Sequence, residues 1–190
     1  MSKYQICVSG AAKGQSVEEG KELAAKLGEA IAHAGHCLLT GATIGLPNYA
    51  AEAYKAAGGT MSVGISPASS KVEHVMKYRL PIKAYDTIIY TGLHYVGRDT
   101  LLITSSDAVV SIGGRLGTLH EFTIAMETDT PIGFLQGAGG VSEQITTLMD
   151  LAHPLRQGAF VTFNDDADTL IRSLTNFLDE EHQKYHTLYQ

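Results

Sequence analysis

Residues 113–121, which read Gly-Gly-Arg-Leu-Gly-Thr-Leu-His-Glu, carry the strongest chemical signal in the sequence. An apolar run at residues 108–112 precedes them and a helical pattern follows them, so a strand, a glycine-rich turn and a helix start lie in series. Such a turn directs backbone N–H groups and the positive end of the helix dipole at one point, which favours an anion such as phosphate. Glu121 lies one turn into the helix, so the sequence predicts a phosphate-binding turn beside a carboxylate, as a nucleotide-processing site requires.

Glu121 and Arg98 are the candidate catalytic residues, and each has two roles open to it. Glu121 either acts beside a bound sugar, as a general base or as a stabiliser of a cationic transition state, or completes a capping box with Thr118. Arg98 lies early in the predicted helix at residues 94–105. It either contacts a phosphate or carboxylate of the ligand or makes an ion pair with Glu121 or Asp99.

Three glycine-rich turns are predicted to bind the phosphate or the nucleotide. The turn after the second predicted strand offers N–H groups and hydroxyls, whereas the lysine of the first turn either reaches the phosphate or is solvated. The candidate binding residues are Gly10, Lys13, Gly41, Thr43, Gly114, Arg115, Leu116, Gly117 and Thr118. The eight histidines show no metal-ligand spacing, and we predict neither a metal site nor a cofactor.

Strand and helix patterns alternate along the chain, which is typical of a parallel sheet covered by helices on both faces. Strands are predicted at residues 4–9, 36–40, 60–65, 87–90, 107–112, 131–135 and 159–163. Helices are predicted at residues 16–33, 47–57 and 94–105, from the glycine turn to 127, from 137–140 to 153, and from the cap at 164–166 to 180. Ser16 is the expected N-cap of the first helix. Residues 66–85 are predicted to be mostly loop with a short helix, a length often found in binding loops.

The expected architecture is therefore one α/β, Rossmann-like domain over residues 1–190, with about seven parallel strands and a polar C-terminal tail at 180–190. In such folds ligands bind at the carboxyl ends of the strands, near the point where the strand order reverses. The turns near Gly10, Gly41, Gly92 and Gly113 are therefore the expected location of the site.

The composition and charge of the chain disfavour some classes of binding partner. The 190 residues are 44% hydrophobic and 18% charged, and the formal net charge is −6. Such a balance is typical of a globular domain and disfavours broad electrostatic binding of nucleic acid or of an acidic membrane. No apolar run approaches the length of a membrane span, and no signal peptide is apparent. The two cysteines, Cys7 and Cys37, lie in apolar runs and are expected to be buried thiols of a cytoplasmic protein.

These motifs together resemble the Lonely Guy family and its "lysine decarboxylase-like" bacterial relatives. The family motif Pro-Gly-Gly-x-Gly-Thr-x-x-Glu aligns with residues 113–121, with matches at Gly114, Gly117, Thr118 and Glu121, and Arg98 falls at the family's arginine. Residues 6–10 and 38–46 are similar to the family's first strand and its second glycine-rich turn. The resemblance covers about residues 4–165.

The resemblance implies a Rossmann-like fold and a homo-oligomer, most simply a dimer. It also implies hydrolysis of nucleoside 5′-monophosphates to free base and ribose 5-phosphate, without lysine decarboxylation. Backbone N–H groups of residues 114–118 would hold the phosphate, Arg98 would contact phosphate or ribose, and Glu121 would stabilise the oxocarbenium-like state and activate water. The helix at residues 94–105 and the helix after Gly45 are the candidate subunit contacts.

The departures from the family pattern favour a second hypothesis. Arg115 replaces a motif glycine, where it either blocks the phosphate or adds a charged contact to it, and Ala42 and Thr43 replace two further glycines. Asp99 stands where the family has lysine, which reverses one charge. Variants at this turn also resemble molybdenum cofactor carrier proteins, which bind a phosphorylated pterin without turnover. Whether this chain is an enzyme is therefore left open, with a non-catalytic carrier as the alternative.

Overall fold

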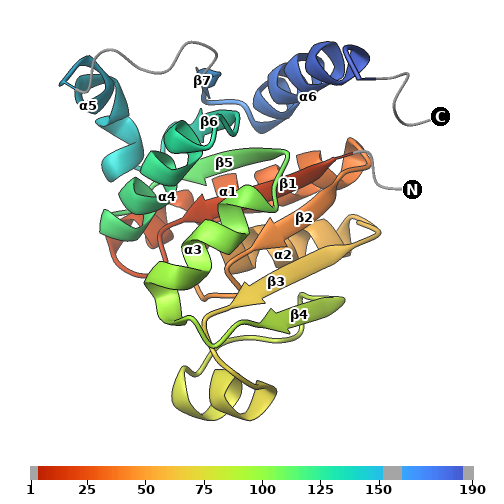
Figure 1. Cartoon of the computed structure of the whole chain (residues 1–190), viewed down its shortest axis with the longest axis vertical. Helices are drawn as coiled ribbons and strands as arrows, with labels where there is room; N and C mark the ends of the chain where they lie inside the picture. Colours follow the sequence, from red (N-terminus) through yellow and green to blue (C-terminus); the bar gives the residue numbers. More distant parts are fainter. Residues whose placement is uncertain (1–3, 152–159, 186–190) are drawn as a thin grey trace.

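The computed structural model describes residues 4–151 and 160–185 and contains one seven-stranded sheet. Its strands are β1 (Gln5–Gly10), β2 (Cys37–Thr40), β3 (Ser62–Ser66), β4 (Thr87–Tyr90), β5 (Ala108–Ile112), β6 (Ile132–Leu135) and β7 (Val161–Asn164). All neighbouring strands are parallel, in the order β4-β3-β2-β1-β5-β6-β7 (Figure 1). This arrangement confirms the predicted α/β fold class.

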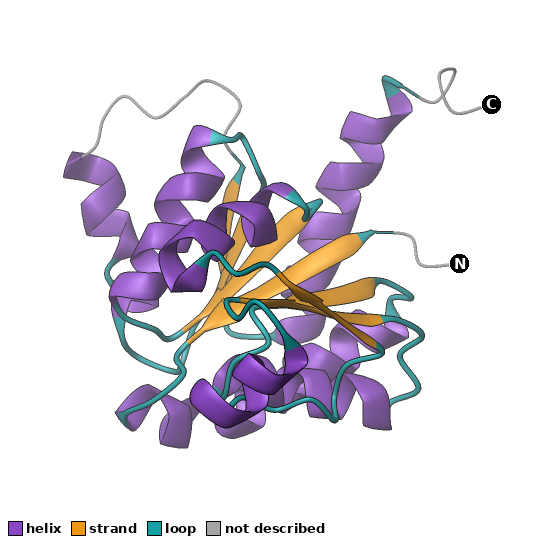
Figure 2. Ribbon diagram, turned by 60° about the horizontal axis from the view of Figure 1, so that its bottom comes forward, coloured by secondary structure: helices purple, strands orange, loops and turns teal. Residues whose placement is uncertain are grey.

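Helices cover both faces of the sheet (Figure 2). They are α1 (Gln15–His33), α2 (Leu46–Ala56), α3 (His94–Thr104), α4 (Leu116–Glu127), α5 (Ile145–Leu151) and α6 (Ala167–Gln183). Successive side chains of a strand point to opposite faces, so Ile6 and Val8 pack with α1, α2 and α6, whereas Cys7 packs with α3, α4 and α5. Both cysteines are buried free thiols.

The strand order reverses at β1. The chain runs outward from β1 through β2, β3 and β4, and then returns to the other side of β1 as β5. The carboxyl ends of β1 and β5 lie in register, with Gly10 beside Ile112. This is the place where doubly wound sheets leave an open crevice. Among the residues that the structure describes, none of the helices is long and apolar enough to cross a membrane.

Several predicted boundaries need correction. Gly14, not Ser16, is the N-cap of α1, because its φ of 98° lets the chain turn into the helix without a side-chain cap. The helix predicted to end near 153 begins as a 3₁₀ turn (Val141–Glu143) followed by α5, and residues 152–159 lie outside the described part of the chain. The short helix expected within residues 66–85 is a π-helical turn (Glu73–Lys77), and Asp166 caps α6 as predicted.

Candidate functional site

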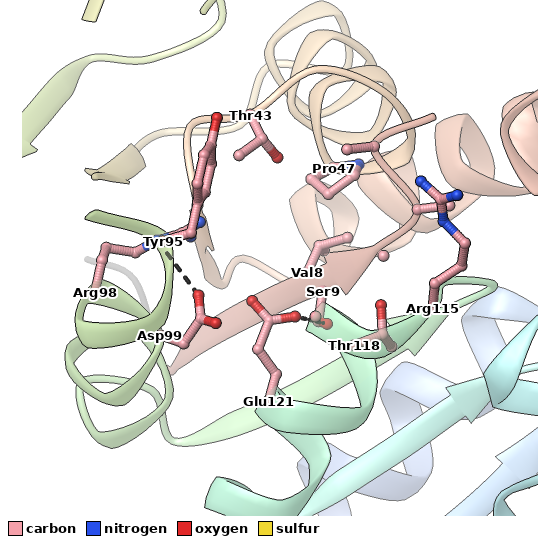
Figure 3. Close-up of a pocket in the computed structure, with 15 residues that line it drawn as sticks. Val8, Ser9, Thr43, Pro47, Tyr95, Arg98, Asp99, Arg115, Thr118 and Glu121 are labelled. Carbon is pink, nitrogen blue, oxygen red and sulfur yellow. Dashed lines mark hydrogen bonds and ion pairs between the residues drawn. The ribbon is translucent and has the colours of Figure 1, made fainter. Parts of the chain in front are cut away.

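A cavity of about 230 Å³ opens at the carboxyl ends of the central strands, where the strand order reverses. The end of β1, the turns after β1 and β2, and the first two turns of α3 and α4 all contribute to its wall. Figure 3 shows Glu121 at the centre, with Arg98 and Arg115 on opposite sides of it.

The turn before α4 depends on two glycines in the left-handed region of the backbone. Gly113 has a φ of 60° and Gly114 a φ of 96°. A Cβ on Gly114 would lie 2.0 Å from Thr118 Oγ1, so the turn also needs the absence of a side chain there. The Gly114 carbonyl accepts a hydrogen bond from Val141 N–H at 3.0 Å, which fixes the turn against the loop that follows β6.

The amino end of α4 offers unpaired backbone donors. The first hydrogen bond from within the helix runs from Leu119 N–H to the Arg115 carbonyl at 3.0 Å. The N–H groups of Leu116, Gly117 and Thr118 therefore have no acceptor inside the helix, and Gly117 and Thr118 line the cavity. Three such amides at the positive end of a twelve-residue helix make a suitable site for a phosphate.

Arg115, which replaces a motif glycine, fits its backbone position without strain. It is the N-cap of α4 with a φ of −138°, outside the left-handed region that would favour glycine. Its exposed side chain lines the cavity and rises beside Thr118 (Figure 3). Ala42 is the replaced glycine that does adopt a left-handed backbone, with a φ of 51°.

Glu121 is not part of a capping box, so that alternative is wrong. Thr118 is the third residue of α4 rather than its N-cap, and Arg115 caps the helix without a side-chain hydrogen bond. The buried Glu121 carboxyl instead accepts a short hydrogen bond from the Ser9 hydroxyl at the end of β1. Burial, and then the charge of Asp99, raise the pKa of Glu121 to about 7. A carboxyl that changes protonation state near neutral pH is suited to proton transfer.

The Arg98 guanidinium is buried, and two of its nitrogen donors have no hydrogen-bond partner in the described chain. It is 4% exposed, and its Nε lies 3.5 Å from Asp99 Oδ1. Within the described chain, its Nε and Nη1 have no hydrogen-bond partner. The guanidinium packs on the backbone of Gly41, where a Cβ would lie only 1.7 Å from Nη1. Because buried charged donors are costly to leave unpaired, this arrangement points to an acceptor supplied by a ligand.

The cavity contains most of the residues predicted from the sequence. Eight of them line it: Gly10, Gly41, Thr43, Arg98, Arg115, Gly117, Thr118 and Glu121. Gly114 is a buried residue of the turn itself, and the Lys13 and Leu116 side chains are exposed and do not line the cavity. The sequence interpretation missed Ser9 and Tyr95 and assigned no site role to Asp99.

Comparisons with known proteins agree with this fold. The SLOG cluster4 family matches residues 3–166. An uncharacterised protein of Archaeoglobus fulgidus is 33% identical over 136 residues, which are 72% of this chain and 82% of that protein.

Two solved structures show the same architecture. The protein TM1055 has a TM-score of 0.78 at 23% identity, over 92% of this chain and 99% of that one. The molybdenum cofactor carrier protein of Chlamydomonas reinhardtii has a TM-score of 0.73 at 28% identity, over 93% of this chain and 99% of that one.

Proposed function

The chain belongs to the SLOG cluster4 family, and from this premise we propose that it binds a phosphorylated heterocyclic small molecule, a nucleotide or a phosphorylated pterin. The similarity to a molybdenum cofactor carrier protein supports a binding and carrier role. In this proposal the phosphate lies on the α4 amides beside Arg115, and the heterocycle lies toward Arg98 and Tyr95.

One observation carries the proposal. Arg98 is almost fully buried, yet two of its donors have no hydrogen-bond partner in the described chain, and it lines the same cavity as the amino end of α4. Two separate anion-binding features in one cavity favour an oxygen-rich anionic ligand. The formal net charge of −6 disfavours broad electrostatic binding of nucleic acid.

Ribose 5-phosphate and ribose form a matched pair of probes for this proposal. We expect ribose 5-phosphate, but not ribose, to raise the melting temperature of the protein, because only the former carries the phosphate. Arg115→Ala should weaken ribose 5-phosphate binding about fivefold or more, since one charge-assisted contact is lost. Lys13→Ala should leave the affinity unchanged, because Lys13 does not line the cavity. Equal stabilisation by both sugars would contradict the proposal.

A second candidate function is hydrolysis of the N-glycosidic bond of a nucleoside 5′-monophosphate, which Glu121 favours. The ionised carboxyl would stabilise positive charge on the ribose ring and accept a proton from the water that adds to C1′, while the base leaves. Its pKa of about 7 suits that role. Incubation with AMP, GMP and other nucleotides, followed by detection of ribose 5-phosphate, separates the candidates: release identifies a hydrolase, and tight binding without release identifies a carrier.

We propose that the protein is a cytoplasmic homo-oligomer whose contact includes α3. Three hydrophobic side chains of α3, Tyr95, Val96 and Leu101, are 45%, 69% and 43% exposed, and exposed side chains of this kind are available for a subunit contact. The wild type is expected to elute as a dimer in light-scattering chromatography, and Val96→Glu as a monomer. Val72→Glu, at a valine that is 71% exposed outside α3, serves as the control and should remain dimeric. A monomeric wild type would refute the contact.

A further inference from the structure

Two buried carboxyl groups line the cavity, and one of them, Asp99, lies on the side of Arg98, away from Arg115 (Figure 3). Asp99 on α3 and Glu121 on α4 are 6% and 9% exposed, and both line the cavity (Figure 3). Two basic groups accompany them: Arg98 Nε lies 3.5 Å from Asp99 Oδ1, and His120 Nδ1 lies 3.0 Å from Asp99 Oδ2. Asp99 is therefore held in place from both sides.

The two carboxyl groups are an unfavourable pair without a ligand. Burial, and then the charge of Asp99, raise the pKa of Glu121, so ionising Glu121 beside Asp99 costs free energy. The Ser9 hydroxyl donates a hydrogen bond to Glu121 Oε2, and Oε1 accepts none within the described chain. A ligand that donates N–H groups to this pair would relieve the repulsion, whereas one that presents only carbonyl oxygens would not.

Arg98 supplies hydrogen-bond donors beside the carboxyl groups, which are acceptors. Arg98 lines the cavity, and its Nε and Nη1 have no hydrogen-bond partner in the described chain, so this side of the cavity combines hydrogen-bond acceptors with an adjacent guanidinium. The complementary ligand edge places N–H donors next to a carbonyl acceptor. Tyr95 adds an aromatic ring to the wall of the cavity, and its ring centroid lies 5.6 Å from that of Tyr78. An aromatic wall suits a flat heterocycle.

We propose that this side of the cavity selects a ring with a 2-amino-4-oxopyrimidine edge, which guanine and pterins share, and that Asp99 is the specificity-determining residue. The amino and ring N–H groups donate to the carboxyl pair, and the ring carbonyl accepts from Arg98. This inference rests on the proposed function, because it assumes that the phosphate of the same ligand occupies the amino end of α4.

GMP and IMP provide the test, because they differ only in the 2-amino group. Isothermal titration of the wild type is expected to give about tenfold tighter binding of GMP than of IMP. Asp99→Asn, which keeps the side-chain shape, should bring the ratio close to one. Asp168→Asn, at an exposed carboxylate on α6, is the control and should keep the ratio of the wild type. Chromatography of the samples verifies that the nucleotides are intact.

The wild-type comparison needs no variant, so it remains decisive even if Asp99→Asn does not fold. Equal affinities for GMP and IMP, with ribose 5-phosphate still bound, would overturn the selectivity alone. Failure of ribose 5-phosphate and of both nucleotides to bind would overturn the proposed function together with it. A GMP preference that persists in a folded Asp99→Asn protein would refute the role of Asp99.

Discussion

Replacing Glu121 by glutamine is expected to stabilise the protein above neutral pH while leaving its stability in acid nearly unchanged. Burial raises the pKa of Glu121 from 4.5 to about 7, so the folded state holds this proton more tightly than the unfolded state does. The protonated carboxyl favours folding below about pH 4.5, and this contribution is lost as the pH rises through about 7. Glutamine is neutral throughout and keeps an oxygen that accepts from Ser9.

The gain from Glu121→Gln should therefore grow between pH 4.5 and about 7 and level off at roughly 3 kcal/mol of unfolding free energy. Denaturant unfolding at about pH 5 and about pH 8 measures this gain. Glu18→Gln, at an exposed carboxylate on α1, is the matched control and should change stability little at either pH. If Glu121→Gln destabilised the protein equally at both values, the buried carboxyl would be playing a purely structural part. In a hydrolase, the same substitution should also abolish release of ribose 5-phosphate.

Gly41→Ala is expected to weaken ligand binding through Arg98, although Gly41 itself carries no chemical group. The new methyl would lie 1.7 Å from Arg98 Nη1, so the guanidinium must leave its position. Gly41 is not in the left-handed region, so the effect is steric rather than conformational. We expect a loss of about 1–3 kcal/mol in stability from overpacking. The affinity for GMP should fall about tenfold or more, because charged hydrogen bonds are displaced.

A double-mutant cycle separates this mechanism from general damage to the fold. Arg98→Ala alone should reduce the affinity for GMP by a similar factor. In the Arg98→Ala background, Gly41→Ala should have little further effect on binding, because the group with which the methyl collides is gone. Additive losses would mean that Gly41 acts on the ligand through another route, such as its backbone N–H.

The fold was predictable because its strongest signals are local. Short apolar strands alternating with amphipathic segments specify a parallel α/β sheet, and glycines mark the turns at the strand ends. Helix starts were less predictable. The N-cap of α1 is a glycine with a φ of 98°. The N-cap of α4 is Arg115, three residues before Thr118, and it follows the left-handed pair Gly113 and Gly114. A pattern of preferred capping residues does not detect starts that backbone geometry determines.

The site was predictable where its residues lie in glycine-rich turns at the strand ends or at recognisable motif positions, and not where a contact joins distant segments. The glycine-rich turn before α4 and Glu121 are close in sequence, so spacing revealed them together. Ser9 pairs with Glu121 across 112 residues, through the register of β1 and β5, which no local pattern reports. Asp99 was considered as a partner of Arg98, but its proximity to Glu121 depends on how α3 packs against α4.

A crystal structure of the protein with ribose 5-phosphate would show directly whether the amino end of α4 binds the phosphate. We expect phosphate density at the amino end of α4, with oxygens within hydrogen-bond distance of the Gly117 and Thr118 amides, and the sugar directed toward Glu121. Clear density for the sugar phosphate at any other place, with the amino end of α4 occupied only by water, would contradict it.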